Sequence, residues 1–66
     1  TGIKNIMQAR NILLIASGTA KAQALYRSLF GPITPLVPAS ILQLHSNVSI
    51  VADEEALSLI LEKGLL

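Results

Sequence analysis

The stretch that decides the fold is Ile12 to Lys21, which reads Ile-Leu-Leu-Ile-Ala-Ser-Gly-Thr-Ala-Lys. Its first five residues are apolar at consecutive positions, which is typical of a parallel strand covered on both faces. Ser17, Gly18 and Thr19 form a turn, and Ser17 or Thr19 can cap the helix that follows. A strand, a glycine turn and a helix in this order place free backbone N–H groups at the carboxyl end of the strand. The stretch therefore predicts an anion site at one edge of a parallel sheet.

The residues after this turn predict a helix and a second strand. Apolar residues recur with helical spacing over residues 20–30, and Gly31 with Pro32 ends that helix. Residues 39–45 can form a short helix. Val48–Ala52 is again a short apolar run, rich in β-branched residues, and predicts a second buried strand parallel to the first.

The two ends of the chain are also predicted to be helical. Residues 5–10 look like the end of a helix, which Asn11 breaks. Asp53 is a good N-cap for a last helix over residues 54–63, and Gly64 supplies its stop. Helices that alternate with parallel strands predict an α/β layer fold, of which this chain holds about half.

Length and composition indicate that these 66 residues are one part of a larger domain. The chain is 52% hydrophobic, with a mean hydropathy of +0.60 and no cysteine. So short a chain has little interior in which to bury that much apolar surface, and it has no disulfide to compensate. The sequence starts without Met and without a secretory signal, so we expect an internal or carboxyl-terminal fragment that spans residues 1–66.

Charge and hydropathy exclude two classes of partner. The net charge is +1, and the five cations are scattered along the chain. Nucleic-acid binding, which needs a clustered basic surface, is therefore not expected. The longest apolar runs are far too short to cross a bilayer, so no membrane partner is expected either.

Lys21 is the strongest candidate for a functional residue. A lysine beside a helix N-terminus adds its charge to the partial positive charge of the free N–H groups there. Gly18 lets the backbone approach an anion closely. The Walker A spacing is absent, so the turn is no nucleotide-phosphate loop of that kind. The alternative is that Lys21 is a solvated residue of a first helical turn, and the residues alone leave both interpretations open.

The other chemically capable residues have simpler structural explanations. His45 is the only histidine, and a lone histidine in apolar surroundings is more often a hydrogen-bonded structural residue than a base or ligand. With no cysteine and no second histidine, we expect no metal site. Asp53, Glu54 and Glu55 form the only carboxylate cluster, which a helix cap and an acidic first turn explain better than acid–base catalysis. No catalytic residue and no cofactor are predicted for this chain.

Three ordered stretches resemble a known family. They are Thr1-Gly2-Ile3-Lys4-Asn5-Ile6-Met7-Gln8-Ala9 with the later Gly18-Thr19-Ala20-Lys21-Ala22, then Pro38-Ala39-Ser40-Ile41-Leu42-Gln43-Leu44-His45, and finally Val51-Ala52-Asp53-Glu54-Glu55-Ala56. Together they resemble the carboxyl-terminal part of glucosamine-6-phosphate deaminases, also called isomerases, and of their galactosamine-6-phosphate relatives.

The resemblance implies a cytoplasmic enzyme with a Rossmann-like parallel sheet. Members of the family convert an amino-sugar 6-phosphate to a ketohexose 6-phosphate and ammonia. The resemblance assigns Lys21 to the substrate phosphate, with Gly18 and Thr19 in the same turn. It places the family's general base, ring-opening histidine and supporting acid upstream of this chain, so His45 is not given the ring-opening role. The expected partners are a hexosamine 6-phosphate and the rest of the polypeptide, and a homo-oligomer is left open.

Three alternatives to the deaminase remain at this stage. The chain can belong to a sugar-phosphate-sensing effector domain of a transcription regulator, which keeps an anion site without turnover. It can belong to a hydrolase that resembles the lactonases of 6-phosphogluconate. It can also be a free-standing interaction fragment, which predicts that these residues fold alone. If the parent protein is an enzyme, the 66 residues by themselves are expected to be inactive, because they lack most of the active site.

Overall fold

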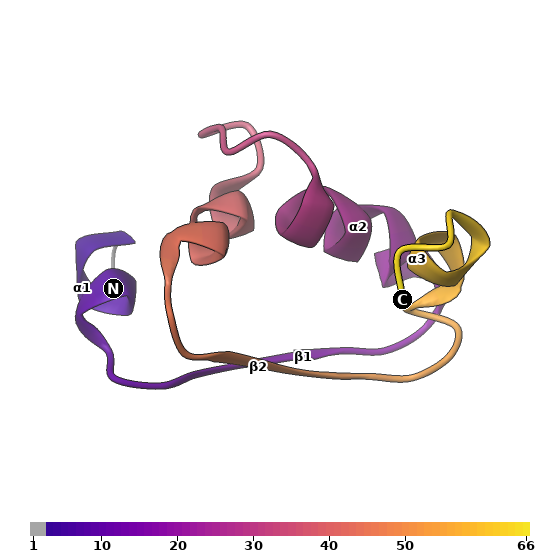
Figure 1. Ribbon diagram of the computed structural model, residues 1–66, viewed down its shortest axis with the longest axis horizontal. Coiled ribbons are helices and arrows are strands. Elements are labelled where there is room, and N and C mark those ends of the chain that lie inside the picture. Colours follow the sequence, from indigo (N-terminus) through magenta and orange to yellow (C-terminus); the bar gives the residue numbers. More distant parts are fainter. Residues whose placement is uncertain (1–2) are drawn as a thin grey trace.

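The computed structural model describes residues 3–66, and it has two layers, a two-stranded sheet and a set of helices above it (Figure 1). Thr1 and Gly2, which begin the first stretch of the family resemblance, lie outside the described residues. The elements in chain order are α1 (Ile3–Gln8), β1 (Ile12–Ala16), the 3₁₀ helix η1 (Thr19–Lys21), α2 (Ala22–Phe30), the 3₁₀ helix η2 (Pro38–Leu44), β2 (Val48–Ala52) and α3 (Ser58–Glu62).

The two predicted strands are confirmed with the same bounds, and they pair in parallel. Ile12 lies opposite Val48, and Ala16 lies opposite Ala52. Because the strands are parallel, their carboxyl ends meet at one edge of the sheet, and the turns that follow Ala16 and Ala52 become neighbours. The molecule is thus a small α/β unit, consistent with an incomplete Rossmann-like domain.

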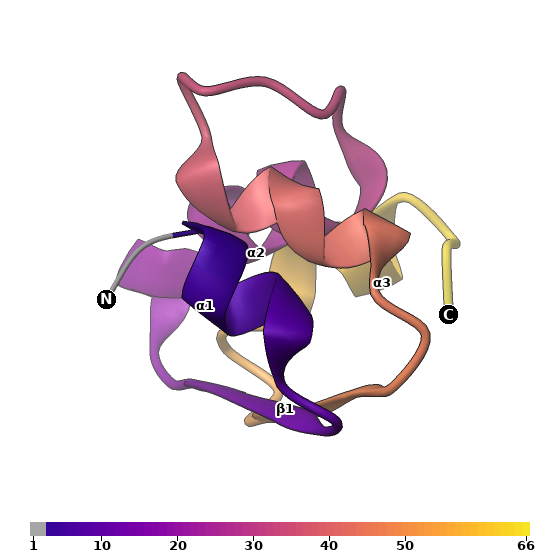
Figure 2. The same cartoon turned by 90° about the vertical axis from the view of Figure 1, so that its left-hand side faces the viewer.

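The core lies between one face of the sheet and the two helices α2 and α3. Leu25 of α2 is 4% exposed, and Ala56 and Ile60 are fully buried. Figure 2, which turns the molecule by 90°, shows the helices stacked on the same side of the strands. The partly buried residues that pack against this centre are Leu14, Ala16, Tyr26, Leu29, Ala52 and Leu57.

The second face of the sheet has no cover within residues 3–66. Leu13 and Ile15 of β1 are 59% and 68% exposed, and Val51 of β2 is 57% exposed. The prediction that Ile12–Ala16 is covered on both faces is therefore wrong for this chain by itself. Consecutive apolar residues indicate that both faces of a strand can be buried, but the described helices all lie on one side of the sheet (Figure 1).

The helix predicted over residues 20–30 begins differently from the expectation. Its first turn is the 3₁₀ helix η1, and the α-helical geometry starts only at Ala22. Neither Ser17 nor Thr19 caps it, since no side-chain cap hydrogen bond is present at the start of η1 or α2. The caps proposed from the sequence are wrong because Gly18, with φ +87° and ψ 156°, occupies the cap position itself. The predicted short helix over 39–45 is likewise a 3₁₀ helix, η2.

The last helix is shorter than the prediction of residues 54–63. Residues 53–57 form tight turns, in which the Leu57 N–H donates to the Asp53 carbonyl at 3.0 Å and the Ser58 N–H to the Glu55 carbonyl at 3.2 Å. The α-helix α3 begins after these turns. Its end is as predicted: Gly64 has φ +71°, and the Leu65 N–H reaches back to the Ile60 carbonyl at 3.1 Å. A left-handed glycine of this kind is the usual stop of a helix.

Gly31 follows the end of α2 and has no room for a side chain. A Cβ at this position would lie 2.7 Å from the Arg27 carbonyl oxygen, while its φ of −83° is one that any residue can adopt. The Gln43 side chain also donates to the Gly31 carbonyl at 2.8 Å and to the Ser28 carbonyl at 3.0 Å, which closes the end of the helix. These hydrogen-bonded carbonyls leave little room for a methyl group.

We therefore expect Gly31→Ala to destabilise the intact protein by about 1–3 kcal/mol, the usual cost of forcing extra volume into a packed site. Denaturant titration measures this change. Gln23→Ala, on the exposed side of the same helix, is the control and should stay within about 0.5 kcal/mol of the parent sequence. Equal stabilities for Gly31→Ala and the control would contradict the steric explanation.

Candidate functional site

The predicted anion site is a turn at the carboxyl edge of the sheet. β1 ends at Ala16, Ser17 and Gly18 leave the strand, and η1 leads directly into α2. The φ and ψ angles of Gly18 fall in a region that is essentially restricted to glycine. No neighbouring atom lies within 4 Å of a Cβ built there, so conformation and not space requires glycine at this position. Gly18 therefore sets the backbone angles of the turn, and the close approach of an anion that the sequence suggests for it stays a prediction.

Two backbone N–H groups of the turn are available. The Lys21 N–H closes the first 3₁₀ turn by donating to the Gly18 carbonyl at 3.1 Å. Within residues 3–66, no protein acceptor takes the N–H of Thr19 or of Ala20. Lys21 itself ends the same 3₁₀ turn, and its side chain is exposed. A cation and two unused donors at the start of a helix form an arrangement that can accept an anionic group.

Asp53 is the residue of this site that sequence reasoning missed. Its carboxylate accepts the Gly18 N–H, at 3.1 Å to Oδ1 and 3.3 Å to Oδ2. Oδ1 also accepts the Ala56 N–H at 2.8 Å, within the turns that precede α3. The cap position of α3 is Leu57, so the prediction that Asp53 caps the last helix is wrong. The second contact follows from the strand register, in which Ala16 lies opposite Ala52 and the turns after them are neighbours, and no pattern in the sequence alone indicates it.

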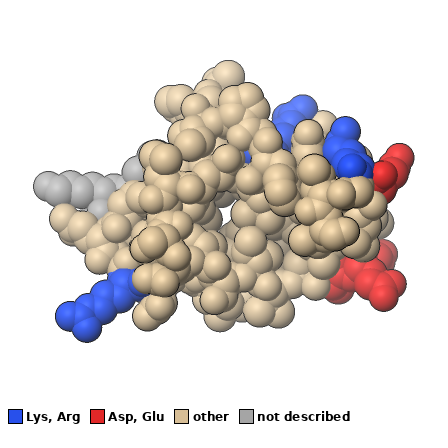
Figure 3. Space-filling view, in the orientation of Figure 1, with Lys and Arg blue, Asp and Glu red and all other residues tan. Residues whose placement is uncertain are grey.

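The charge around the turn is mixed. All four acidic residues of the chain fall between positions 53 and 62, and Figure 3 shows the red carboxylates gathered at the right-hand end of the molecule. Lys21 therefore shares its surroundings with Asp53. A phosphate monoester carries a charge of about −1.5 to −2 at neutral pH. One lysine beside one carboxylate does not neutralise such a group.

His45 has the structural role that its isolation suggested. Its Nε2 lies 2.6 Å from the Ala9 carbonyl oxygen, and its Nδ1 is 2.9 Å from the Asn47 backbone nitrogen. Because a carbonyl only accepts and an amide N–H only donates, the ring is the neutral tautomer protonated on Nε2. Both nitrogens are engaged, and the ring ties the end of α1 to the start of β2. It lies at the amino edge of the sheet, away from Lys21.

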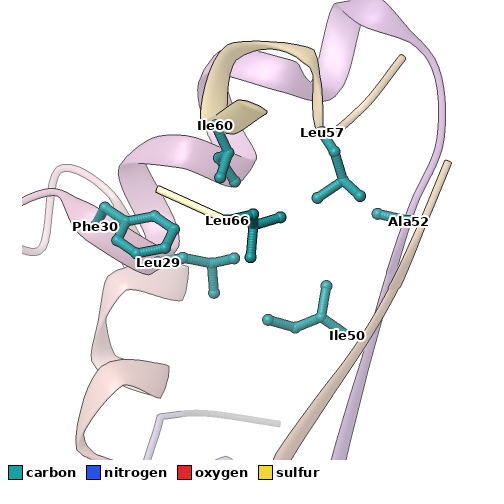
Figure 4. A pocket seen from close by; sticks show the side chains of 7 residues that line it. All are labelled: Leu29, Phe30, Ile50, Ala52, Leu57, Ile60 and Leu66. Carbon is teal, nitrogen blue, oxygen red and sulfur yellow. The ribbon is translucent and has the colours of Figure 1, made fainter. Parts of the chain in front are cut away.

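An apolar cavity between the helices and the sheet is separate from the Lys21 turn. It has a volume of about 390 Å³ and lies between α2, β2 and α3, with Leu66 folded over it (Figure 4). The side chains that line it are Leu29, Phe30, Ile50, Ala52, Leu57, Ile60 and Leu66. None of these side chains offers a hydrogen bond or a charge, so the cavity cannot hold a phosphate.

Among residues 3–66, no group of three or more His, Cys, Asp or Glu side chains comes together as a metal site would require. The described helices are also all too short, or too polar, to cross a membrane.

Comparison with known proteins identifies related sequences. No family model matches the chain. The chain is 54% identical over 59 residues to the glucosamine-6-phosphate deaminase of Streptococcus gordonii strain Challis. It is 52% identical over 59 residues to the glucosamine-6-phosphate deaminase of Streptococcus pneumoniae serotype 4 strain TIGR4. Each match covers 89% of this chain but only 25% of the relative.

The chain thus spans about a quarter of the length of the curated relatives it matches. Its similarity to them includes the turn, both strands and the Asp53 region, since the match leaves out only seven of the 66 residues. The family resemblance seen in the sequence is confirmed, and this chain is homologous to one part of the glucosamine-6-phosphate deaminases.

Proposed function

We propose that the intact protein is an amino-sugar-phosphate deaminase, and that this chain supplies part of its phosphate site. The observation that carries the proposal is the identity of 52–54% to proteins named glucosamine-6-phosphate deaminase. The proposed reaction converts glucosamine 6-phosphate, or galactosamine 6-phosphate, to the ketohexose 6-phosphate and ammonia. The proposed location is the cytoplasm, where such sugar phosphates are present.

Lys21, Gly18 and Thr19 have separate roles in the proposed phosphate site. The Lys21 ammonium group binds a phosphate oxygen, and the free N–H groups of Thr19 and Ala20 donate to the same group. Gly18 provides the backbone angles that direct these donors outward. Its own N–H is already bound to Asp53, so it shapes the turn and does not donate to the phosphate.

The proton transfers of the reaction are assigned to the rest of the polypeptide. Ring opening and the movement of a proton from C2 to C1 need an acid and a base within hydrogen-bond reach of the sugar. Both nitrogens of His45 are engaged by the backbone, and the Asp53 carboxylate holds two N–H groups. The missing acid, base and additional phosphate-binding cation come from the remaining part of the protein, and no metal or cofactor is invoked.

The same remaining part is proposed to cover the bare face of the sheet. Leu13, Ile15 and Val51 present a continuous apolar surface there, which water would otherwise contact. The relatives are about four times longer than the matched segment, so enough chain exists to bury it.

The assay of the intact protein tests this function directly. With glucosamine 6-phosphate we expect equimolar release of ammonia and fructose 6-phosphate, while the isolated 66-residue chain releases neither. Galactosamine 6-phosphate assayed in parallel identifies the preferred hexosamine. Hydrolysis of 6-phosphogluconolactone without ammonia release would favour the lactonase alternative, and tight sugar-phosphate binding without turnover would favour the sensor.

A further inference from the structure

We propose that Asp53 is a positioning residue for the phosphate-binding turn. It acts through the Gly18 backbone without touching the substrate. This inference rests on the proposed function, because it assigns a role in the binding of the same phosphate. It goes beyond the capping role that the sequence suggests for Asp53.

The first argument is the pair of contacts that one carboxylate makes. Asp53 is 35 residues away from Gly18 in the chain, yet Oδ1 and Oδ2 lie 3.1 and 3.3 Å from the Gly18 nitrogen. Oδ1 also lies 2.8 Å from the Ala56 nitrogen. One side chain therefore joins the turn after β1 to the turn after β2, across the edge of the sheet.

The second argument is the conformation that this contact holds. The angles of Gly18, φ +87° and ψ 156°, are available to glycine only, and a glycine has many alternative conformations that it can adopt. The Lys21 N–H restrains Gly18 through its carbonyl, and Asp53 restrains it through its N–H. With both ends of Gly18 held, the next two N–H groups, of Thr19 and Ala20, have a defined direction.

The third argument is electrostatic. A carboxylate beside a phosphate site repels the anion. An acidic residue at this position therefore has to aid binding in another way, which outweighs the repulsion. Asp53 accepts two N–H groups, which offset part of its charge, and the side chain is exposed to water, which screens the rest. The repulsion is therefore small, and the orientation of the turn is the larger effect.

Asp53→Ser separates the two roles of this residue. A serine hydroxyl can still accept the Ala56 N–H as a helix-cap residue does, but it is too short to reach Gly18. In the intact deaminase we expect Asp53→Ser to raise KM for glucosamine 6-phosphate by about five- to thirtyfold. The kcat should stay within about twofold, because a phosphate held away from the reacting carbons binds equally in the ground and transition states. Inorganic phosphate, used as a competitive inhibitor, should weaken by the same factor as the substrate.

Asp53→Asn and Gly64→Ala complete the test. In Asp53→Asn the side-chain amide oxygen keeps one acceptor for the turn. The KM of this variant should therefore fall between those of the parent and Asp53→Ser. If the serine variant does not fold, the asparagine variant still tests the proposal. Gly64→Ala strains the other end of α3, since Gly64 has φ +71°, and it controls for lost stability. It should lower the melting temperature and leave KM unchanged.

The outcomes separate this inference from the proposed function. An unchanged or lowered KM in both Asp53 variants would overturn the positioning role. If Gly64→Ala raised KM as much as Asp53→Ser does, the effect would be one of stability and the positioning role would again fail. If Lys21→Ala leaves KM and phosphate inhibition unchanged, the phosphate site itself is wrong. If Lys21→Ala raises KM and the Asp53 variants do not, only the role of Asp53 fails.

Discussion

Lys21→Ala should lower kcat/KM of the intact protein for glucosamine 6-phosphate by about ten- to a hundredfold. The change removes the proposed charge-assisted hydrogen bond to the phosphate, and such bonds contribute about 1.5–3 kcal/mol. The Thr19 and Ala20 N–H groups remain, so binding is weakened and not abolished. Steady-state kinetics, with a thermal melt of the same preparation, measures the effect. Because the Lys21 side chain is exposed, the melting temperature should not move.

Two further variants sharpen the result for Lys21. Lys21→Arg should recover only part of the activity, because a planar guanidinium does not replace a compact ammonium group at a tight turn. Arg27→Ala removes another cation farther along α2 and should leave kcat/KM unchanged. Equal kinetics for Lys21→Ala and the parent protein would mean that Lys21 is a solvated residue and does not bind the phosphate.

Ile15→Asp should have opposite consequences in the intact protein and in the isolated chain. Ile15 is 68% exposed here, on the sheet face that the rest of the polypeptide is proposed to cover. In the intact protein an unpaired carboxylate would then be buried, which costs several kcal/mol. Since 1 kcal/mol shifts the melting temperature of a protein of 150–250 residues by about 2–4 °C, we expect a fall of about 10 °C or a failure to fold.

In the isolated 66-residue chain the same substitution should reduce self-association. The apolar face is open there, and a charge on it opposes contact between copies. Sedimentation velocity of the isolated chain tests this half of the prediction. Leu36→Asp is the matched control, because Leu36 is 91% exposed on the connection between α2 and η2, on the far side from the sheet (Figure 1). A melting temperature that falls equally in both intact variants would contradict the proposed cover.

Local sequence patterns were sufficient to predict the secondary-structure elements and their order. The strands β1 and β2 were predicted with their observed bounds, because each is a five-residue run, apolar except for Ser49, that lies between turn formers. The stops at Gly31 and Gly64 were also predictable, since glycine permits close approaches and left-handed angles that other residues do not. The resemblance to glucosamine-6-phosphate deaminases likewise needed only the ordered motifs, and the related sequences confirm it.

The starts of the helices were harder to predict from the sequence than their ends. Ser17 and Thr19 look like caps in the sequence, but Gly18 takes the cap position, and the chain enters α2 through a 3₁₀ turn. The start of α3 is delayed in the same way by the turns at residues 53–57. These differences arise because the turns after β1 and β2 contact each other at the edge of the sheet. Local residue propensities carry no information about that contact.

The sequence by itself determined the strands, the glycine turn and the candidate Lys21, because each depends on residues close together in the chain. Tertiary structure alone decided that Asp53 holds Gly18, because that contact joins residues 35 positions apart and exists only when two parallel strands align. It also decided that one face of the sheet stays bare. Apolar periodicity shows which faces of a strand can be buried, but the cover itself comes from whatever segment packs there, and residues 3–66 supply it for one face only.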